Sequence, residues 1–244
     1  MSTSLLSRLI KHPADYVGIC KTTNISLKEH RTEDGGIHTF IFTPEKPLTW
    51  KAGQHSIFTI PDQAVTGKKW RAFSIASSPH EDVIQISTNI SAEPSDFKQK
   101  MLNLSPGDKM HMRGPFGEFY IKPEMKHIVG IVGGIGITPL RSIISNADNL
   151  QDQTKITLIY SATEHYTYKA ELEDWSNKNP NINVIYTHTP DEVLTELSSL
   201  IDTCKDTAHY FISGAPRMIE SLQETCLGKK ISKSHIISDP FKGY

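Results

Sequence analysis

Apolar residues follow two different rhythms along this chain of 244 residues. In the first half the apolar runs are short and rich in β-branched residues, and turn residues such as Asp34-Gly35-Gly36 separate them. This pattern indicates β-strands. We expect six of them, at Tyr16–Ile25, His38–Thr43, His55–Ile60, Arg71–Ile75, Val83–Asn89 and Lys109–Arg113. With a single helix expected at Asp96–Leu104, this half is predicted to be a closed antiparallel β-barrel.

After Pro123 strands and helices alternate. Strands are expected at His127–Val132, Lys155–Tyr160, Ile182–Tyr186, Tyr210–Ser213 and Ser234–Ile237. The helices between them are expected at Pro139–Asn149, Lys169–Asn177, Asp191–Ile201 and Pro216–Leu227. Such alternation is typical of an α/β domain with a doubly wound parallel sheet. The sequence therefore predicts two domains, an antiparallel β-barrel over residues 13–122 and a parallel-sheet α/β domain over residues 123–244.

Charge and hydropathy exclude some classes of partner. The chain has 26 basic and 27 acidic residues, spread along its length, so no nucleic-acid partner is expected. No apolar stretch is long enough to span a membrane, and the N-terminal segment does not resemble a signal peptide. Nothing in the sequence specifies an oligomeric state.

Cysteine and histidine usage narrows the chemistry further. Cys20, Cys204 and Cys226 are far apart, whereas a cysteine-ligated iron–sulfur cluster needs four thiolates. Unpaired thiols suit a reducing compartment, so we expect a cytoplasmic protein. The eleven histidines show no HxxxH or HxxE spacing, and no metal site is expected.

The sharpest local motif is the glycine-rich segment from Gly133 to Pro139, which reads Gly-Gly-Ile-Gly-Ile-Thr-Pro. It follows a buried strand and precedes a helix. Glycines allow the backbone to turn tightly and to approach a ligand. Thr138 is expected as the helix N-cap and Pro139 as the first helical residue, which directs amide donors and the positive helix end into the loop. This favours a pyrophosphate site, although a structural turn that ends a strand is the alternative.

A second motif, Arg71-Ala72-Phe73-Ser74-Ile75-Ala76-Ser77-Ser78-Pro79, lies in the barrel half. An arginine binds pyrophosphate with two parallel hydrogen bonds, an aromatic ring stacks on a flat ring, and a hydroxyl donates to a ring heteroatom. Taken alone, this motif is better explained by an ordinary barrel strand with a half-buried phenylalanine and an arginine that extends to solvent.

Five motifs in a fixed order make the pattern specific. The arginine motif is followed by Ser95-Asp96-Phe97-Lys98, by the loop Gly114–Phe119, by the glycine-rich segment and by Ile212–Met218. Together with the final residues Asp239–Tyr244, this order resembles the ferredoxin–NADP reductase superfamily over nearly the whole chain after about residue 15.

The resemblance implies that the barrel holds FAD. Arg71 would contact a phosphate, Phe73 would lie against the isoalloxazine ring and Ser74 near its reactive nitrogen. Ser95 and Lys98 would form a second phosphate contact, although Glu93 and Asp96 beside them would repel phosphate, and a capped surface helix is the alternative. The flavin site would also include Thr88, Phe97, Gly114, Phe116, Gly117 and the terminal Phe241.

The same resemblance implies that the second domain holds NAD(P)H. Its pyrophosphate would lie against Gly133, Gly134, Gly136, Thr138 and Pro139. Ser213 and Gly214 would lie at the nicotinamide, with Met218 nearby. Ser74, Ser213 and Asp239 are the implied catalytic residues, of which the two serines orient and polarise the cofactors; for Asp239 a solvated tail carboxylate is the alternative.

The sequence departs from the family at three positions. Phe73 stands where tyrosine is usual, Ser213 where cysteine is common and Ala215 where proline is usual. The first change removes a hydroxyl hydrogen bond, and the second removes a soft sulfur atom beside the nicotinamide. Both predict slower hydride transfer without loss of the fold.

The implied activity is hydride transfer from NAD(P)H to FAD, followed by electron release to a separate acceptor such as a ferredoxin, flavodoxin, haem protein or oxygenase. A free-flavin or ferric reductase, or a non-catalytic flavin-binding protein that senses redox state, are alternatives. NADH is favoured over NADPH because the segment Ser161–His165 contains Glu164 and no arginine for the extra phosphate. Lys169 is the residue that could reverse this preference.

Overall fold

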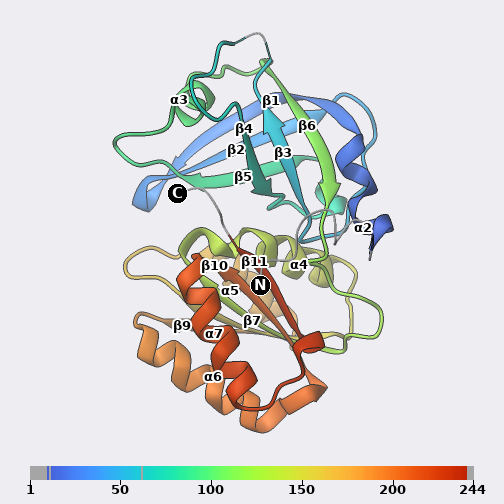
Figure 1. Cartoon of the computed structure of the whole chain (residues 1–244), viewed down its shortest axis with the longest axis vertical. Helices are drawn as coiled ribbons and strands as arrows, with labels where there is room; N and C mark the ends of the chain where they lie inside the picture. Colours follow the sequence, from blue (N-terminus) through green and yellow to red (C-terminus); the bar gives the residue numbers. More distant parts are fainter. Residues whose placement is uncertain (1–9, 11, 62, 241–244) are drawn as a thin grey trace. The chain divides into compact units, whose positions relative to one another are not determined.

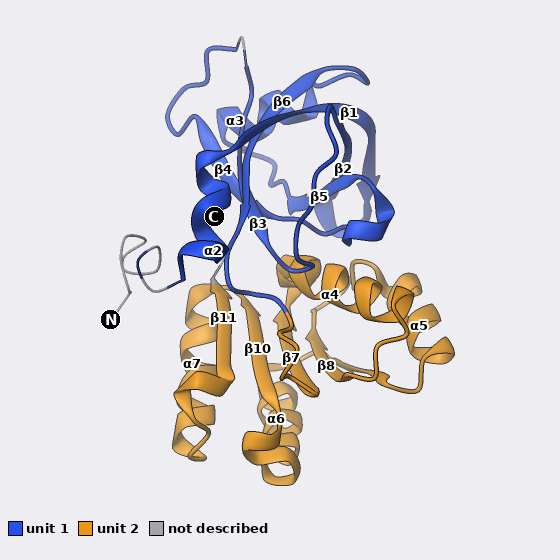
Figure 2. Ribbon diagram, turned by 90° about the vertical axis from the view of Figure 1, so that its right-hand side faces the viewer, with its two compact units in different colours: residues 1–120 blue, residues 121–244 orange. Residues whose placement is uncertain are grey.

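The computed structural model describes residues 10, 12–61 and 63–240. The chain divides into two compact units, Met1–Tyr120 and Ile121–Tyr244, which are coloured separately in Figure 2. Each unit is built around a sheet of its own: six strands in the first and five in the second.

The first unit is an antiparallel sheet with the strand order β4-β3-β6-β1-β2-β5 (Figure 1). Its strands are β1 (Thr22–Glu33), β2 (Ile37–Pro44), β3 (His55–Thr59), β4 (Trp70–Ser74), β5 (Ile84–Asn89) and β6 (Lys109–Phe116). The turn between β1 and β2 is Asp34-Gly35-Gly36, in which both glycines have positive φ angles of 69° and 70°. Only glycine adopts such angles freely, which is why this sequence forms the hairpin.

The core of this unit lies on the inner face of the curved sheet. Phe40 and Phe42 of β2 and Ile84 and Ile86 of β5 are fully buried there. The short helix α3 (Asp96–Leu102) adds Phe97 and Met101 to the same core. On β2 and β5, alternate residues therefore face the apolar interior, as the period-two pattern predicts.

Three expectations for this unit need correction. The segment Tyr16–Cys20 is not a strand: α2 (Pro13–Tyr16) and a 3-10 turn at Val17–Cys20 occupy it, and β1 runs on to Glu33. Helix α3 ends at Leu102, before Leu104. The antiparallel barrel is confirmed in kind, but the sheet is open, since β4 and β5 are its two edges.

The second unit is a five-stranded parallel sheet with the order β11-β10-β7-β8-β9. The strands are β7 (His127–Gly133), β8 (Lys155–Ser161), β9 (Ile182–Thr187), β10 (His209–Gly214) and β11 (Ile236–Pro240). The helices are α4 (Ile137–Asn149), α5 (Lys169–Lys178), α6 (Pro190–Cys204) and α7 (Pro216–Gly228). The predicted doubly wound fold is confirmed, with the last strand starting two residues later than expected.

Strand order determines where this unit can bind a ligand. From β7 the chain proceeds outwards through β8 and β9 and then returns to place β10 on the other side of β7. Helices α6 and α7 share one apolar core, which includes Val129 and Ile212. Open α/β sheets bind ligands at the carboxyl ends of the strands where the order reverses. That point lies between β7 and β10, which end at Gly133 and Gly214.

Within the described residues, no helix is long and apolar enough to cross a lipid bilayer.

Candidate functional site

Arg71 of β4 is held by the backbone of its own strand and the segment before it. Its Nη1 donates hydrogen bonds to the carbonyl oxygens of Lys68 (2.7 Å) and Trp70 (2.9 Å). Its guanidinium lies 5.2 Å from the centre of the Phe97 ring, which belongs to the core. Partial burial lowers the pKa of Arg71. Phe97 thus supports Arg71 from below, and its full burial makes it a core residue.

Helix α3 brings a second cation to the same place. Ser95 is the N-cap of this helix, and its hydroxyl accepts a hydrogen bond from the Lys98 amide. The ammonium group of Lys98 donates to the Asn89 carbonyl at 2.6 Å. Burial, with a smaller contribution from the charge of Arg71, lowers the pKa of Lys98 to about 8. A desolvated pair of like charges is unfavourable for stability and is characteristic of a site that receives an anion.

One of the two acidic residues that oppose this assignment, Asp96, lies in a separate contact. The Asp96 carboxylate accepts hydrogen bonds from the Thr66 amide (2.5 Å) and from the Lys100 ammonium (2.9 Å). These two donors, in that order, lower the pKa of Asp96. Its charge is therefore offset by Thr66 and Lys100, which weakens its repulsion of an anion at Lys98.

Three further residues predicted for the flavin lie on strands: Phe73 and Ser74 end β4, and Thr88 is in β5. The Phe73 ring is half-buried and its centre lies 5.8 Å from that of Phe58. Ser74 is buried, and Thr88 is buried with its hydroxyl donating to the Asn89 carbonyl at 3.3 Å. The structure thus brings Arg71, Phe97, Lys98 and the residues flanking Asn89 together. The binding roles of all of them stay predictions.

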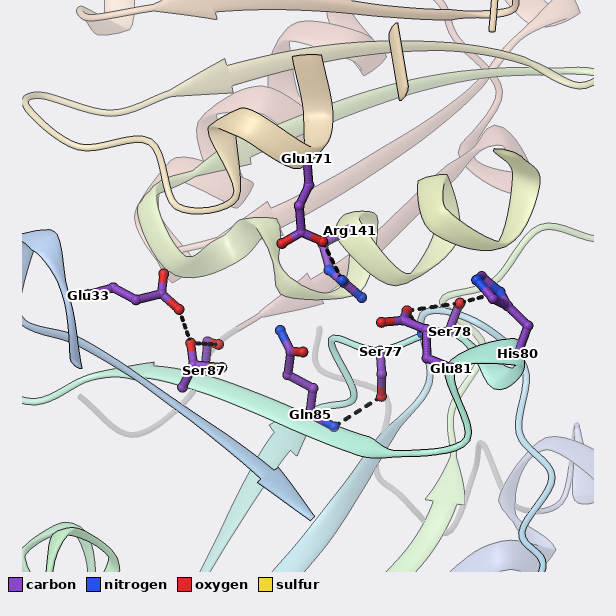
Figure 3. A network of polar contacts seen from close by, with 10 residues as sticks. Glu33, Ser77, Ser78, His80, Glu81, Gln85, Ser87, Arg141 and Glu171 are labelled. Carbon is purple, nitrogen blue, oxygen red and sulfur yellow. Dashed lines mark hydrogen bonds and ion pairs between the residues drawn. The ribbon is translucent and has the colours of Figure 1, made fainter. Parts of the chain in front are cut away.

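The second half of the arginine motif has a structural role that the sequence did not reveal. The Ser77 hydroxyl donates to the Val83 carbonyl (2.6 Å) and accepts from the Gln85 amide (3.0 Å). Ser78 caps the turn Pro79–Glu81 and also contacts His80 at 2.7 Å. These bonds, of which Ser77–Gln85 and Ser78–His80 are drawn in Figure 3, shape the loop between β4 and β5. The two adjacent hydroxyl residues before a proline were the available signal.

Gly114 and Phe116 lie at the end of β6, which pairs with β3, and Gly117 follows directly, so the expected loop starts later than Gly114. Phe116 is buried, with its ring edge-on to His55 at 4.4 Å between centres. Gly117 has a φ angle of 112°, and a Cβ atom there would lie 2.8 Å from the His55 ring. This position therefore requires glycine.

In the second unit, helix α4 begins earlier than predicted. A 3-10 turn at Gly134–Gly136 leads directly into α4 at Ile137, so Gly136 is the N-cap residue. Thr138 is not the N-cap and Pro139 is not the first helical residue. The Thr138 hydroxyl donates to the Ile135 carbonyl at 3.2 Å, which is a bond within the turn. The positive end of the helix consequently lies within the glycine run itself.

The glycine run lies against the end of β10. A Cβ atom on Gly136 would stand 2.5 Å from the Ser213 carbonyl oxygen, and one on Gly133 would stand 2.6 Å from the Met218 sulfur. Beside Gly134, by contrast, a Cβ atom would meet nothing within 4 Å. The loop is therefore packed on one side and open beside Gly134. This geometry leaves space for a phosphate group next to backbone amides.

Ser213 and Asp239 are neighbours on adjacent parallel strands. Ser213 is fully buried, and its hydroxyl donates to the Asp239 carbonyl at 3.5 Å. Gly214 follows with a φ angle of 150°. The catalytic roles given to Ser213 and Asp239 stay predictions, and Phe241 lies outside the described residues.

The segment after β8 carries the groups relevant to cofactor choice. Glu164 is exposed, with its carboxylate 3.9 Å from His165. Lys169, the one basic residue that could favour NADPH there, lies 3.7 Å from Glu173 one turn along α5. Between α4 and α5, the buried Arg141 forms an ion pair with Glu171 (Figure 3) and contacts the rings of Tyr168 and Trp175, each centred 5.4 Å away.

Comparison with known proteins agrees with this architecture. Residues 131–224 match the family model described as the oxidoreductase NAD-binding domain. The F component of the Na(+)-translocating NADH-quinone reductase of Methylococcus capsulatus is 25% identical over 251 residues, which covers 92% of this chain and 57% of that protein. The chain thus spans little more than half the length of this curated relative, and 49% of the corresponding protein of Pseudomonas aeruginosa.

Solved structures share the fold. The cytochrome b5 reductase domain of Ulva prolifera nitrate reductase is 21% identical with a TM-score of 0.73, covering 90% of this chain and 98% of that one. A mutant ferredoxin-NADP+ reductase from Plasmodium falciparum is 14% identical with a TM-score of 0.75, covering 91% and 97%. The chain therefore has the two-domain fold of these reductases, which is the fold expected from the ordered motifs. Within its second unit, residues 131–224 match the oxidoreductase NAD-binding domain.

Gly136→Ala is expected to destabilise the chain, because the added methyl group would overlap the Ser213 carbonyl oxygen and overpacking of this kind costs about 1–3 kcal/mol. Gly228→Ala is the matched control, since a Cβ atom on that helical glycine would meet nothing within 4 Å. Urea unfolding of both variants measures the difference. Equal stability of the two variants would contradict the close approach of the glycine run to β10.

Lys98→Met is expected to change how stability depends on pH. With its pKa lowered to about 8, Lys98 opposes folding fully below that pH, and its cost disappears as pH rises towards the ordinary value near 10.5. The variant should therefore gain relative stability at pH 6–8 and lose this advantage between pH 8 and 10. Unfolding free energies across this range test it, with the exposed Lys69→Met as control. A pH-independent difference for Lys98→Met would show that the residue is not desolvated.

Proposed function

We propose that this chain is a flavin-dependent oxidoreductase that takes hydride from NAD(P)H onto FAD and passes electrons to a separate acceptor. The observation that carries the proposal is the pair of partly buried cations, Lys98 on α3 and Arg71 near the start of β4, the strand that also carries Phe73 and Ser74. The oxidoreductase NAD-binding domain match over residues 131–224 supports the nicotinamide half. The flavin half is supported by solved structures that share the fold and whose descriptions name FAD. We assign FAD to residues 13–122 and NAD(P)H to residues 123–244.

In the first unit the chain supplies charge and a flat surface. Arg71 and Lys98 would neutralise the FAD diphosphate, and the N-cap at Ser95 places the start of α3 beside it. The half-buried Phe73 ring would support the isoalloxazine, and the Ser74 hydroxyl would donate to it. Bound flavin supplies the redox chemistry, since it accepts a hydride and releases electrons singly.

In the second unit, backbone groups would make the contacts to the dinucleotide. The amides of Gly133, Gly134 and Gly136 would hold the dinucleotide pyrophosphate at the positive end of α4. Ser213, fixed by its bond to the Asp239 carbonyl, would define the wall beside the nicotinamide. Because that hydroxyl is already used within the protein, its contribution is positioning.

NADH is the proposed cofactor. Glu164 would repel a 2′-phosphate, and the positive charge of Lys169 is partly offset by Glu173. No other lysine or arginine lies between Ser161 and Lys169.

The acceptor is proposed to be a separate carrier, because the three cysteines of this chain cannot ligate an iron–sulfur cluster that needs four. Exposed Trp70, with the Lys68 ammonium 3.9 Å from its ring and Lys69 beside it, forms a basic and aromatic surface next to Arg71. Such a surface suits an acidic carrier protein. The cytoplasmic location stays a prediction.

The test is to purify the chain, identify any released flavin and follow oxidation of NADH and NADPH side by side with an artificial electron acceptor. We expect yellow protein, FAD as the released flavin, and a higher kcat/KM for NADH. Protein that is colourless and cannot be reconstituted with FAD or FMN would refute the proposal. Reduction of the flavin without turnover would instead support the redox-sensing alternative.

Arg71→Ala is the decisive variant. Loss of one charged hydrogen-bond donor is worth about 1.5–3 kcal/mol, so FAD should bind about 10- to 100-fold more weakly. Arg113→Ala, which removes an exposed arginine from β6 of the same sheet, is the matched control and should retain flavin. If both variants keep full flavin occupancy, Arg71 does not hold a phosphate.

A further inference from the structure

Asp15, at the end of the short helix α2, joins two side chains that are distant in sequence. Its carboxylate is 9% exposed, and Oδ1 accepts hydrogen bonds from Lys51 Nζ at 2.9 Å and from Tyr120 Oη at 2.8 Å. The Lys51 ammonium also lies 3.9 Å from the centre of the Tyr120 ring. The three groups therefore form a compact set that we call the Asp15 clamp.

The backbone of Asp15 is hydrogen-bonded directly to Gly117, the residue that follows β6. The Gly117 amide donates to the Asp15 carbonyl oxygen at 2.8 Å. The Gly117 carbonyl accepts from Gln54 Nε2 at 3.1 Å, and Gln54 Oε1 accepts from the Lys51 amide at 3.0 Å. Both backbone groups of Gly117 are thus fixed by the two segments that carry the clamp, at a residue that the His55 ring already restricts to glycine.

Electrostatics favour a defined geometry for this set. Burial lowers the pKa of Lys51, but its bonds to Tyr120 and Asp15 more than offset this and raise the pKa overall. Burial is also the main cause of the raised pKa of Tyr120. Both donors therefore carry their protons at neutral pH. An ion pair whose lysine is half exposed adds little net stability, so its main effect here is to define position.

We propose that Asp15 is a positioning residue for the flavin: with Lys51 and Tyr120 it fixes the segment Gly114–Tyr120, which comprises the end of β6 and the residues after it, and this segment forms a wall of the flavin site. This inference rests on the proposed function, which places Gly114, Phe116 and Gly117 beside the flavin. Asp15 itself touches no cofactor. It acts through the backbone of Gly117 and the phenol of Tyr120.

The test uses Asp15→Asn, which keeps the size and one acceptor oxygen but removes the charge, and Tyr120→Phe, which removes a single hydrogen bond. Glu45→Gln is the matched control, because Glu45 pairs with Lys109 at 2.6 Å in the same sheet without contacting the segment Gly114–Tyr120. Lys51→Arg keeps the charge and is the conservative variant. Each full-length variant is titrated with FAD, and the visible circular dichroism of the bound flavin and hydrogen exchange of the amides of this segment are recorded.

We expect Asp15→Asn and Tyr120→Phe to weaken FAD binding about tenfold, which corresponds to one hydrogen bond, to change the flavin dichroism and to speed exchange at Gly117. Glu45→Gln should change none of these, and Lys51→Arg should stay close to wild type. Tyr120→Phe keeps the ion pair, so this variant still tests the inference if Asp15→Asn fails to fold.

Two outcomes separate the inference from the function on which it rests. If the wild type binds FAD and the two clamp variants bind it with equal affinity and equal dichroism, the clamp serves stability alone and the inference is wrong. If the wild type binds no flavin at all, the proposed function fails and the inference fails with it.

Discussion

The constraint on which the first unit depends is the placement of two positive charges in partly buried positions. Arg71 is supported by the ring of Phe97 and by two backbone carbonyls, and Lys98 by the Asn89 carbonyl. The free-energy cost of desolvating these cations must be offset by the apolar core beneath them, where β2, β5 and α3 bury a continuous set of large side chains. A bound diphosphate would offset the free-energy cost of desolvation, because its negative charge would stabilise both cations in place of the water that burial has removed. The proposed anion site of the first unit therefore depends on the apolar core of the same unit.

The second unit would also hold a negatively charged diphosphate, but without charged side chains. Reversal of strand order places the ends of β7 and β10 side by side, and absence of a side chain at Gly136 allows the turn to pack against the Ser213 carbonyl. The helix dipole of α4 and the backbone amides then supply the positive potential. Backbone donors need no rotamer ordering on binding, whereas Arg71 and Lys98 must be ordered by their neighbours.

Sequence patterns predicted the parts that depend on local rules. Alternation of strands and helices after Pro123 indicated the parallel sheet and its four helices, and the Asp-Gly-Gly turn marked the first hairpin. The first strand was misplaced because Tyr16–Cys20 is apolar enough to resemble a strand, while Pro13 starts a helix there. Thr138 was mistaken for an N-cap because a 3-10 turn inside the glycine run starts the helix earlier. The Asp15 clamp was invisible to sequence, since its three residues are separated by up to 105 positions and only the tertiary fold joins them.

The central claim is that Arg71 and Lys98 form an anion site for the flavin diphosphate. The most direct measurement is the proton uptake that accompanies FAD binding, obtained by calorimetry at pH 8 in buffers of different ionisation enthalpy. The pKa of Lys98 is about 8 in the free chain, so Lys98 is neutral in roughly half of the molecules at that pH. A bound diphosphate should protonate Lys98 in these molecules, with uptake of about half a proton per FAD. Lys98→Met should abolish this uptake. Binding of FAD without proton uptake, or equally tight binding of riboflavin, which has no phosphate, would contradict the account.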